Sequence, residues 1–545
     1  MDLEISDTLR NRLLGCIDPD SPLGQRLNEC AVYHGRSVVP SKLFDEPALN
    51  AFHDLCETVG ERTTMLQIAA LRRIRNEPAG IKVDKLELFI PALVAYLFKD
   101  IEDGWLYRRN KDGVLLPWLV SYVRQYQPEN GWGSPYVIVG LKANTIWSAH
   151  NEATSDSTQR DGGMTNAIVF HKHDLVGKTI PELLAERGYF KETAELKQEY
   201  EAHEQRFLAL QSRFGMQFSC RNALFLANGP QDTEFMKMPR GMVAKCVNDE
   251  GVLERNFDFN ADTTFWRELG IPFGFERVPL HCYLYLFHLE LHRNVWVHVQ
   301  NLEPYEYKPE LREKLVLPDS HRDLIDILTS DMEVLQDDIV EGKSGGTIIL
   351  CQGAPGLGKT LTAEVYSEVV GKPLYRVHSG QLGITAESVE ANLSTVLQRA
   401  ARWDAIMLLD EADVYIRCRD NDLQHNAIVA EFLRTLEYFS GLLFMTTNRI
   451  DDVDDAILSR CIATIRYDVP PREAAARLWQ TLAAQFDVEL PPALIDTLVD
   501  TYAQASGRDI KELLKLTARF CKSKGQPLSA EAFAQCAVFR GLGGN

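Results

Sequence analysis

Eight consecutive residues have the types and the spacing needed to bind phosphate. In chain order they are Gly353, Ala354, Pro355, Gly356, Leu357, Gly358, Lys359 and Thr360. Glycines let backbone N–H groups converge on phosphate oxygens, because they have no Cβ that would clash. We expect Lys359 to reach the β- and γ-phosphates and Thr360 to ligate Mg²⁺. The stretch therefore predicts a loop that binds a nucleotide together with Mg²⁺.

The residues on both sides of this loop supply the elements that must position it. Residues 347–351 form a short apolar run that predicts a buried strand, and residues 361–366 predict the start of a helix. The helix N-terminus adds a partial positive charge beside the phosphates, so Leu361 joins the expected nucleotide-binding residues. A chance glycine-rich loop is the alternative, and a strand and a helix in this order argue against it.

A pair of acidic residues, Asp410 and Glu411, follows the apolar run 405–409. Ligands of parallel α/β sheets bind at the carboxyl ends of the strands, which is where this pair would lie. We expect Asp410 to hold Mg²⁺ through water, and Glu411 to orient and polarise the attacking water. The alternative is a strand that ends in a solvated acidic turn, which a position about 50 residues after a phosphate loop disfavours.

Three polar residues farther along the chain could complete the site. Asn448 ends another apolar strand, and two such strands side by side would bring it near the γ-phosphate and the attacking water. Arg460 lies just before the strand predicted at 462–467, and Arg508 lies in the first turn of a predicted helix.

Taken in order, these motifs resemble the core and the small helical lid of an AAA ATPase over residues 314–545. Within that family, the chain is most similar to AAA proteins of fungi and bacteria that carry a large, uncharacterised N-terminal domain. The resemblance implies that Asn448 is the sensor that positions the water. It also implies that Arg460 is an arginine finger reaching the neighbouring subunit's nucleotide, and that Arg508 is a lid sensor that touches the phosphates.

The finger assignment rests on the resemblance, which favours Arg460 over Arg449 and Arg466. A surface salt bridge is the alternative role for Arg460. The best-known members carry a pair of arginines here, whereas this chain has Ser459-Arg460-Cys461. Coupling that needs the second arginine is therefore not expected from this sequence.

A second departure concerns the loop at 379–385. Family members that thread proteins usually present an aromatic residue on this loop, and the chain has none there. Leu382 or Ile384 could still grip a polypeptide, but the pattern weakens the case for processive threading.

The predicted fold class is α/β: a P-loop AAA core with a parallel sheet and a small helical lid, preceded by a large mixed α+β region. We place a recognition region at residues 1–313, the core at 314–470 and the lid at 471–545. The recognition region divides into a helical part, 1–126, and a mixed α/β part, 136–313.

Within the mixed part, apolar residues spaced alternately by four and three predict one long helix over 192–214. Residues 215–313 look β-rich, and a turn signal at 248–251 separates two short apolar runs. Four histidines lie on the predicted strands: His281, His288, His292 and His298. Their spacing is not compact enough for a metal site, so we expect structural roles on a sheet face.

Composition restricts the partners and the compartment. The 545 residues carry a net charge of −19, which disfavours general binding to nucleic acid or to an anionic membrane. Eleven scattered cysteines with no Cys-x-x-Cys pair favour a reducing cytoplasm. The N-terminus lacks an apolar signal region, and the longest apolar stretch, 88–98, is too short to span a bilayer.

Three functions follow from the residues and the resemblance. The first is an ATPase ring, a hexamer by the family pattern, that binds ATP between subunits and remodels an unidentified protein. The second is an ATP-gated sensor or scaffold whose output is assembly. The third, remodelling of nucleic acid, would use a small basic cluster of Arg72, Arg73 and Arg75, and the net charge makes it the least favoured.

Overall fold

The computed structural model describes residues 2–542 except 30–35, 41–42, 63, 66–67, 69–81, 84–85, 87–88, 90–91, 94–95, 98–104, 111–112, 127–133, 145–147, 150–162, 222–223, 227–234, 238–242, 255–277, 331–345, 420–421 and 438. The basic cluster of Arg72, Arg73 and Arg75 lies outside the described residues. Among the described helices, none is long and apolar enough to cross a bilayer.

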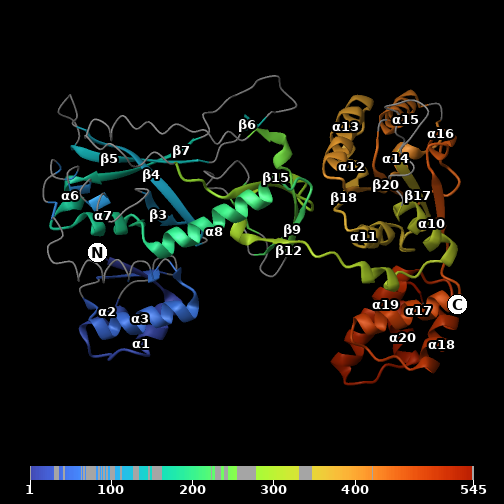
Figure 1. Ribbon diagram of the computed structural model, residues 1–545. Coiled ribbons are helices and arrows are strands. Elements are labelled where there is room, and N and C mark those ends of the chain that lie inside the picture. The colour runs from blue at the N-terminus through green and yellow to red at the C-terminus, as the bar shows by residue number, and fades with distance from the viewer. Residues whose placement is uncertain are drawn as a thin grey trace.

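The first 60 residues form a small unit with its own core (Figure 1). Its elements are β1 (Asp2–Ser6), α1 (Asp7–Leu14), α2 (Pro22–Glu29), β2 (Arg36–Pro40) and α3 (Glu46–Val59). The side chain of Asp45 caps α3 by accepting a hydrogen bond from the Ala48 N–H, and Gly60 ends the helix at a φ of +77°.

An antiparallel five-stranded sheet follows, in the order β7-β5-β4-β3-β8. Its strands are β3 (Trp105–Arg109), β4 (Leu115–Tyr126), β5 (Tyr136–Asn144), β7 (Gly163–His171) and β8 (Tyr189–Lys191). Two short helices, α6 (Lys172–Leu175) and α7 (Ile180–Glu186), connect β7 to β8. The expectation that the helical part extends to residue 126 is wrong, because β3 and β4 pair with each other as strands of this sheet, with most of their side chains buried.

The long helix α8 (Ala194–Gln211) joins this sheet to a second, seven-stranded one (Figure 1). The predicted helix is confirmed, and its buried seam of Leu196, Tyr200, Phe207 and Leu210 packs into the core that both sheets share. The seam therefore faces the helix's own region rather than a coiled-coil partner.

The β-rich prediction is also confirmed. The strands of the second sheet, in the order β11-β10-β15-β14-β12-β9-β16, are β9 (Gln217–Arg221), β10 (Leu224–Leu226), β11 (Phe235–Lys237), β12 (Val243–Asn248), β14 (Tyr283–His288), β15 (Arg293–His298) and β16 (Leu302–Pro304). The turn predicted at 248–251 is confirmed, because the short 3₁₀ turn Glu250–Val252 closely follows β12. After this turn, β13 (Leu253–Glu254) pairs with β6 (Ser148–Ala149), because both edges of β12 are already taken by β9 and β14.

The histidines of this sheet lie inside the protein or at its edge. His281, His288 and His298 are buried, and His281 Nε2 lies 2.9 Å from the Pro117 carbonyl oxygen. Burial lowers the pKa of His281 to about 4. Among the described residues, the only group of three side chains that could share a metal ion is an exposed one at His53, and it includes none of these four histidines.

The second half of the chain contains a parallel five-stranded sheet in the order β18-β19-β20-β17-β21. Its strands are β17 (Thr347–Gly353), β18 (Leu374–His378), β19 (Ile406–Asp410), β20 (Leu442–Thr447) and β21 (Ala463–Tyr467). Its helices are α11 (Lys359–Val370), α12 (Ser379–Leu382), α13 (Ala386–Arg402), α14 (Asp413–Ile416), α15 (Leu423–Leu436) and α16 (Asp455–Leu458).

This sheet is buried on both faces, because successive side chains of a strand point to opposite sides. Along β17, Ile348 and Leu350 join one apolar cluster, whereas Ile349 and Cys351 join the other. Four further helices with a separate core form the lid: α17 (Arg472–Gln485), α18 (Pro492–Thr501), α19 (Gly507–Lys524) and α20 (Ala530–Val538). The predicted α/β P-loop fold with a helical lid is confirmed.

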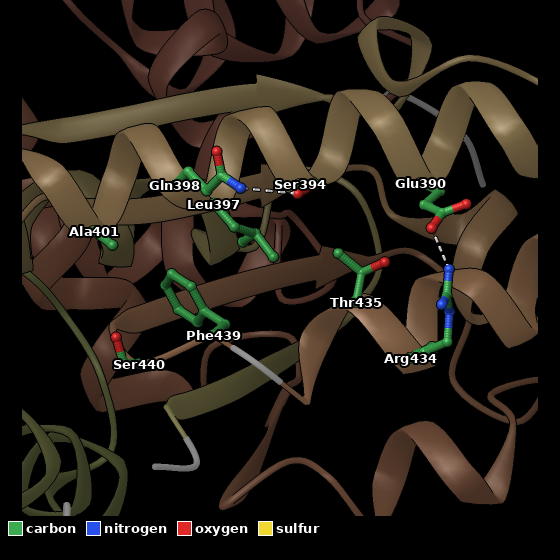
Figure 2. Close-up of a pocket in the computed structure, with 9 residues that line it drawn as sticks. All are labelled: Glu390, Ser394, Leu397, Gln398, Ala401, Arg434, Thr435, Phe439 and Ser440. Carbon is green, nitrogen blue, oxygen red and sulfur yellow. Dashed lines mark hydrogen bonds and ion pairs between the residues drawn. The ribbon is translucent and has the colours of Figure 1, made fainter. Parts of the chain in front are cut away.

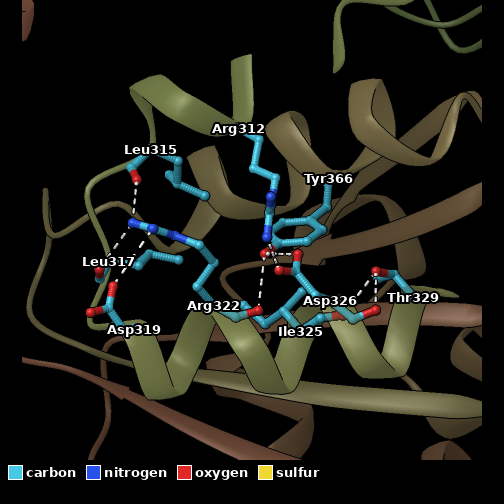
Figure 3. Close-up of polar contacts among 9 residues, drawn as sticks. All are labelled: Arg312, Leu315, Leu317, Asp319, Arg322, Ile325, Asp326, Thr329 and Tyr366. Atoms are coloured by element: carbon cyan, nitrogen blue, oxygen red, sulfur yellow. Dashed lines mark hydrogen bonds and ion pairs between the residues drawn. The ribbon is translucent and has the colours of Figure 1, made fainter. Parts of the chain in front are cut away.

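The linker that precedes the core is hydrogen-bonded to α11 (Figure 3). It consists of the 3₁₀ helix η4 (Pro309–Lys314) and α10 (Asp319–Ser330). Tyr366 of α11 donates a hydrogen bond to Asp326 Oδ1 over 2.9 Å, and Arg312 donates to the other oxygen of Asp326. The Arg322 guanidinium donates to the carbonyls of Leu315 and Leu317. The helix that opens at the phosphate loop is thus tied directly to the linker.

The seven-stranded sheet also packs against the core. Asp249, which follows β12, accepts hydrogen bonds from the Arg402 guanidinium and from Trp403 Nε1, the latter at 2.7 Å. Beside them, the Phe287 ring lies 4.9 Å from the Trp403 ring, measured between centroids. A second contact centres on Glu368 of α11, which accepts hydrogen bonds from Tyr305 Oη and Lys245 Nζ. These buried contacts join the two halves of the chain.

Candidate functional site

The loop from Gly353 to Gly358 has a backbone that only glycine adopts without strain at three positions. Gly353, Gly356 and Gly358 have φ values of +151°, +83° and +101°. A Cβ on Gly353 would lie 2.4 Å from the Tyr467 carbonyl oxygen, and one on Gly356 would lie 2.7 Å from Ser506 Oγ. The glycine spacing is therefore required both by the turn and by close neighbours in the core and the lid.

Lys359 begins α11 and is buried. Its Nζ donates to the carbonyl oxygens of Gly353 and Ala354, at 2.6 and 2.8 Å, and to Asn448 Oδ1 at 3.0 Å. Burial lowers the pKa of Lys359, and the nearby carboxylate of Asp413 opposes this effect. The ammonium group is thus held over the loop, next to the residue predicted to be the sensor.

Asp410 ends β19 and lies next to Thr360 of α11. Its Oδ1 accepts hydrogen bonds from Thr360 Oγ1 at 2.9 Å and from Thr446 Oγ1 at 2.6 Å. Burial alone would raise the pKa of Asp410, but these two hydroxyls and the Arg376 guanidinium outweigh it and lower the pKa. The carboxylate therefore stays ionised, and the Thr360 hydroxyl donates a hydrogen bond to it while its own oxygen lone pairs stay free for a cation.

Glu411 adopts an unusual backbone conformation. Its φ is +56°, in the left-handed region that costs a non-glycine residue about 1–2 kcal/mol. The Glu411 N–H donates to Thr446 Oγ1, and the Ala412 N–H donates to the Thr446 carbonyl oxygen. This turn leaves the Glu411 side chain exposed at the strand end, where a general base would have to lie.

Asn448 is held from two sides. Its Oδ1 accepts from Lys359, as described above, and its backbone N–H donates to Asp413 Oδ1 at 3.1 Å. Asp413 also accepts a hydrogen bond from the Thr447 hydroxyl. The side chain is thus fixed in the space between the phosphate loop and the acidic strand end.

The other predicted residues lie around this centre. The backbone N–H of Arg508, in α19 of the lid, donates to the Gly356 carbonyl oxygen at 3.1 Å, and its side chain is exposed. Leu361 is half exposed at the start of α11. Arg460 follows α16, and its partners are Glu437 and the Ala456 carbonyl oxygen rather than residues of the phosphate loop. Pro355 is exposed and Leu357 is half-buried in the same loop.

These residues fit a nucleotide with Mg²⁺. The loop offers a concave turn of backbone N–H groups, and Lys359 supplies a cation for the phosphates. The hydroxyl of Thr360 and the carboxylate of Asp410 are hard oxygen donors of the kind that Mg²⁺ prefers. We expect no clash with a phosphate chain, because each of the tight positions in the loop is glycine.

Sequence reasoning missed three residues of the site: Thr446, Asp413 and Arg376. Thr446 lies on β20 and holds both Asp410 and the Glu411 backbone. Arg376 lies on β18 and donates to Asp410 Oδ2 at 2.5 Å. The pairing of β18 and β20 with β19 brings these side chains in, so only the strand order could have revealed Thr446 and Arg376. Asp413 had a local signal, because it lies in the acidic motif itself.

The loop at 379–385 presents one apolar side chain to solvent. Ile384 is 84% exposed, whereas Leu382 is fully buried, so of the two predicted gripping residues only Ile384 is available. The Tyr415 hydroxyl, on α14, lies 2.5 Å from the Ser379 carbonyl oxygen and 2.9 Å from that of Gly383. The loop is therefore anchored to the segment that directly follows Asp410 and Glu411.

A cavity of about 420 Å³ lies away from these residues, between α13 and α15 (Figure 2). Leu397 and Phe439 line its floor, and an ion pair between Glu390 and Arg434 crosses one end. None of its lining residues belongs to the phosphate loop or to the acidic strand end. The cavity is therefore separate from the candidate site.

Comparison with known proteins agrees with this geometry. The sequence model of the ATPase family associated with various cellular activities (AAA) matches residues 349–469. An uncharacterised AAA family ATPase, y4kL, of Sinorhizobium fredii is 29% identical over 163 residues, which cover 28% of this chain and 48% of that protein.

Two further relatives each match about a third of this chain. The ATP-dependent zinc metalloprotease FtsH 3 of Sphaerobacter thermophilus is 27% identical, over 36% of this chain and 42% of that protein. Spastin of Naegleria gruberi is 26% identical, over 31% of this chain and 35% of that protein. The chain thus spans about half or less of the length of these relatives. The resemblance drawn from the motifs is confirmed: residues 349–469 of this chain form an AAA ATPase domain.

Proposed function

We propose that the chain binds and hydrolyses ATP at the Lys359–Asp410 site, as one subunit of a ring that remodels a protein partner. One observation carries the proposal. Lys359 and Thr360, Asp410, and Asn448 come from three separate stretches of the sequence, and they lie in direct hydrogen-bonded contact with one another or with a shared neighbour. In this proposal residues 314–470 are the ATPase core, 471–545 the lid and 1–313 the region that selects the partner.

Each side chain has one task in the reaction. Lys359 exchanges its bonds to the Gly353 and Ala354 carbonyls for bonds to the β- and γ-phosphates. Glu411 accepts a hydrogen bond from the attacking water and polarises it, while Asn448 fixes that water in line with the γ-phosphate. Thr360 and Asp410 would hold Mg²⁺, which would supply positive charge beside the phosphate oxygens.

The ring is proposed because Arg460 is not directed at its own site. Its guanidinium is paired with Glu437 at the end of α15, and its side chain is only 29% exposed. A finger supplied by the neighbouring subunit would act at the other subunit's γ-phosphate. Arg508 contacts the loop through its backbone, so movement of the lid changes the loop geometry.

Action on a protein is supported by the loop that carries Ile384. An exposed isoleucine on a loop anchored by Tyr415 can contact an apolar stretch of another polypeptide. Since Tyr415 lies four residues after Glu411, a shift of the acidic strand end on hydrolysis would move this loop. The loop has no aromatic residue, which supports short pulling steps on a partner more than continuous threading.

The test compares two variants of the full chain. Lys359→Ala should lose ATP binding, whereas Glu411→Gln should bind ATP and lose turnover by more than a hundredfold, as expected when a positioned general base is removed (roughly 10²–10⁴ in rate). Equal turnover in Glu411→Gln and the unmodified chain would refute the catalytic assignment. Capture of proteins from the source cells by Glu411→Gln with ATP, against Lys359→Ala as the control, tests the remodelling step. A protein enriched only with Glu411→Gln supports remodelling.

A second candidate is an ATP-gated sensor or scaffold. The observation that favours it is the contact between the recognition region and α11. There Glu368 accepts hydrogen bonds from Tyr305 Oη, Lys245 Nζ and the Lys308 backbone N–H. Such a contact can report nucleotide binding without pulling on a partner. An ATP-dependent ring that captures no protein in the experiment above favours this function. Remodelling of nucleic acid remains the least favoured, given the net charge of −19.

A further inference from the structure

Arg376 lies beside the residues that would hold Mg²⁺, although no motif pointed to it. It belongs to β18, which pairs with β19 so that His378 lies opposite Asp410. Its NH2 group donates to Asp410 Oδ2 at 2.5 Å, and its NH1 group lies 3.6 Å from Glu364 Oε1. One guanidinium therefore bridges two carboxylates at the metal end of the site.

The bonds of Asp410 show what this bridge does. Its Oδ1 already accepts two hydroxyls, from Thr360 and Thr446, so Oδ2 is the oxygen with capacity left over. Arg376 donates its hydrogen bond to that oxygen. The Asp410 side chain is only 7% exposed, so few other donors can reach it. Water bound to Mg²⁺ would need the same acceptor, because Asp410 is expected to reach the metal through water. Arg376 and the hydrated cation therefore share one oxygen.

Glu364 adds a second negative charge on the same side. It follows Thr360 by four residues in α11, so the two side chains lie on one face of the helix. Asp410 and Glu364 together carry two negative charges, and the Arg376 guanidinium cancels one of them. A divalent cation is attracted to this end of the site less strongly with Arg376 present than without it.

We propose that Arg376 is a built-in counter-cation of the metal site, which holds Asp410 Oδ2 and weakens the binding of Mg²⁺ to the nucleotide-bound protein. The proposal rests on the proposed function, since it takes the Thr360–Asp410 pair as the metal site. Arg376 is thus a positioning residue: it acts on the reaction through Asp410.

The test measures the contribution of Mg²⁺ to ADP binding, which requires no turnover. The dissociation constant of a fluorescent ADP analogue is measured for the full chain in excess EDTA and in excess Mg²⁺. The constant in EDTA divided by the constant in Mg²⁺ reports how much the metal strengthens ADP binding. Arg376→Met keeps the apolar stem and removes the charge, and it should raise this ratio on the order of tenfold. Arg376→Lys keeps the charge, and its ratio should stay within about threefold of the unmodified chain.

The matched control is Arg434→Met, which removes an exposed, ion-paired guanidinium from α15 and should leave the ratio unchanged. Arg376→Gln is the second neutral variant if Arg376→Met does not fold. A ratio that is unchanged or lower in the neutral variants, with ADP binding intact, overturns the role of Arg376 and leaves the proposed function standing. An unmodified chain that binds no ADP in either condition overturns both.

Discussion

One of the two contacts that join the halves of the chain is centred on a single residue, Asp249. Its side chain is 2% exposed and accepts from Arg402, from Trp403 Nε1 and, through Oδ2, from Asn294 Nδ2 at 2.9 Å. The change Asp249→Ala removes all of these acceptors at once. Trp403 is itself buried, so its indole N–H would be left without an acceptor inside the protein.

The magnitude follows from these exposures. Breaking a buried ion pair costs about 3–5 kcal/mol, because the surviving charge loses its partner. The Arg402 side chain is 28% exposed, so water relieves part of this cost, and we expect about 3 kcal/mol for Asp249→Ala. Asp249→Asn keeps an oxygen for Trp403 and loses only the ionic part, so about 1.5 kcal/mol is expected. The control, Glu390→Gln, breaks an exposed pair on the same helix and should cost about 0–1 kcal/mol.

Hydrogen exchange measures this cost locally, at the two segments that Asp249 joins. Amides at the end of α13 and in β12 should exchange about a hundredfold faster in Asp249→Ala, and about tenfold faster in Asp249→Asn. Amides of the lid core, which does not touch Asp249, should keep their rates. If α13 and β12 exchange in Asp249→Ala as they do in Glu390→Gln, the joint is not held by Asp249 and the reasoning fails.

Two further predictions concern pH and the ring. Burial lowers the pKa of His281 to about 4, so below pH 6.5 its imidazole is protonated in the unfolded chain but not in the folded one. The contribution of His281 to the free energy of unfolding is therefore fully present above pH 6.5. It declines by about 1.4 kcal/mol per pH unit as the pH falls from 6.5 to about 4. Measured by urea unfolding, the free energy of unfolding should fall less steeply between pH 7 and 5 in His281→Gln than in the unmodified chain. A change at the exposed His173 should leave this slope as it is. Identical slopes in the unmodified chain and both variants would contradict the assignment. Arg460→Ala should be inactive alone and should regain part of its turnover when mixed with Lys359→Ala subunits, as read from ATP hydrolysis after mixed rings are shown by native mass spectrometry. Rings that mix without any recovery would argue against a finger supplied in trans.

Much of the second half could be predicted because its signals are local. The strand, the glycine loop and the helix that begins at Lys359 are continuous in the chain, and so are β19 and the Asp410–Glu411 pair. Apolar runs mark the three central strands β17, β19 and β20, since these are buried on both faces, whereas the edge strands β18 and β21 are partly exposed. The first half was predicted less well. β4 lies in the part that the sequence predicts to be helical. Nothing local in the sequence indicates that β13 pairs with β6, because β6 lies about a hundred residues earlier.

The sequence by itself determined that this chain carries a phosphate loop, an acidic strand end and a polar residue on a third strand, because each depends on neighbours in the chain. The tertiary structure alone decided which other side chains meet there. Arg376 and Thr446 reach Asp410 only because β18 and β20 flank β19, and Asp249 reaches Trp403 from 154 residues away. Hydrogen bonds between distant segments depend on strand order and on docking, and neither is written in the local spacing of residues.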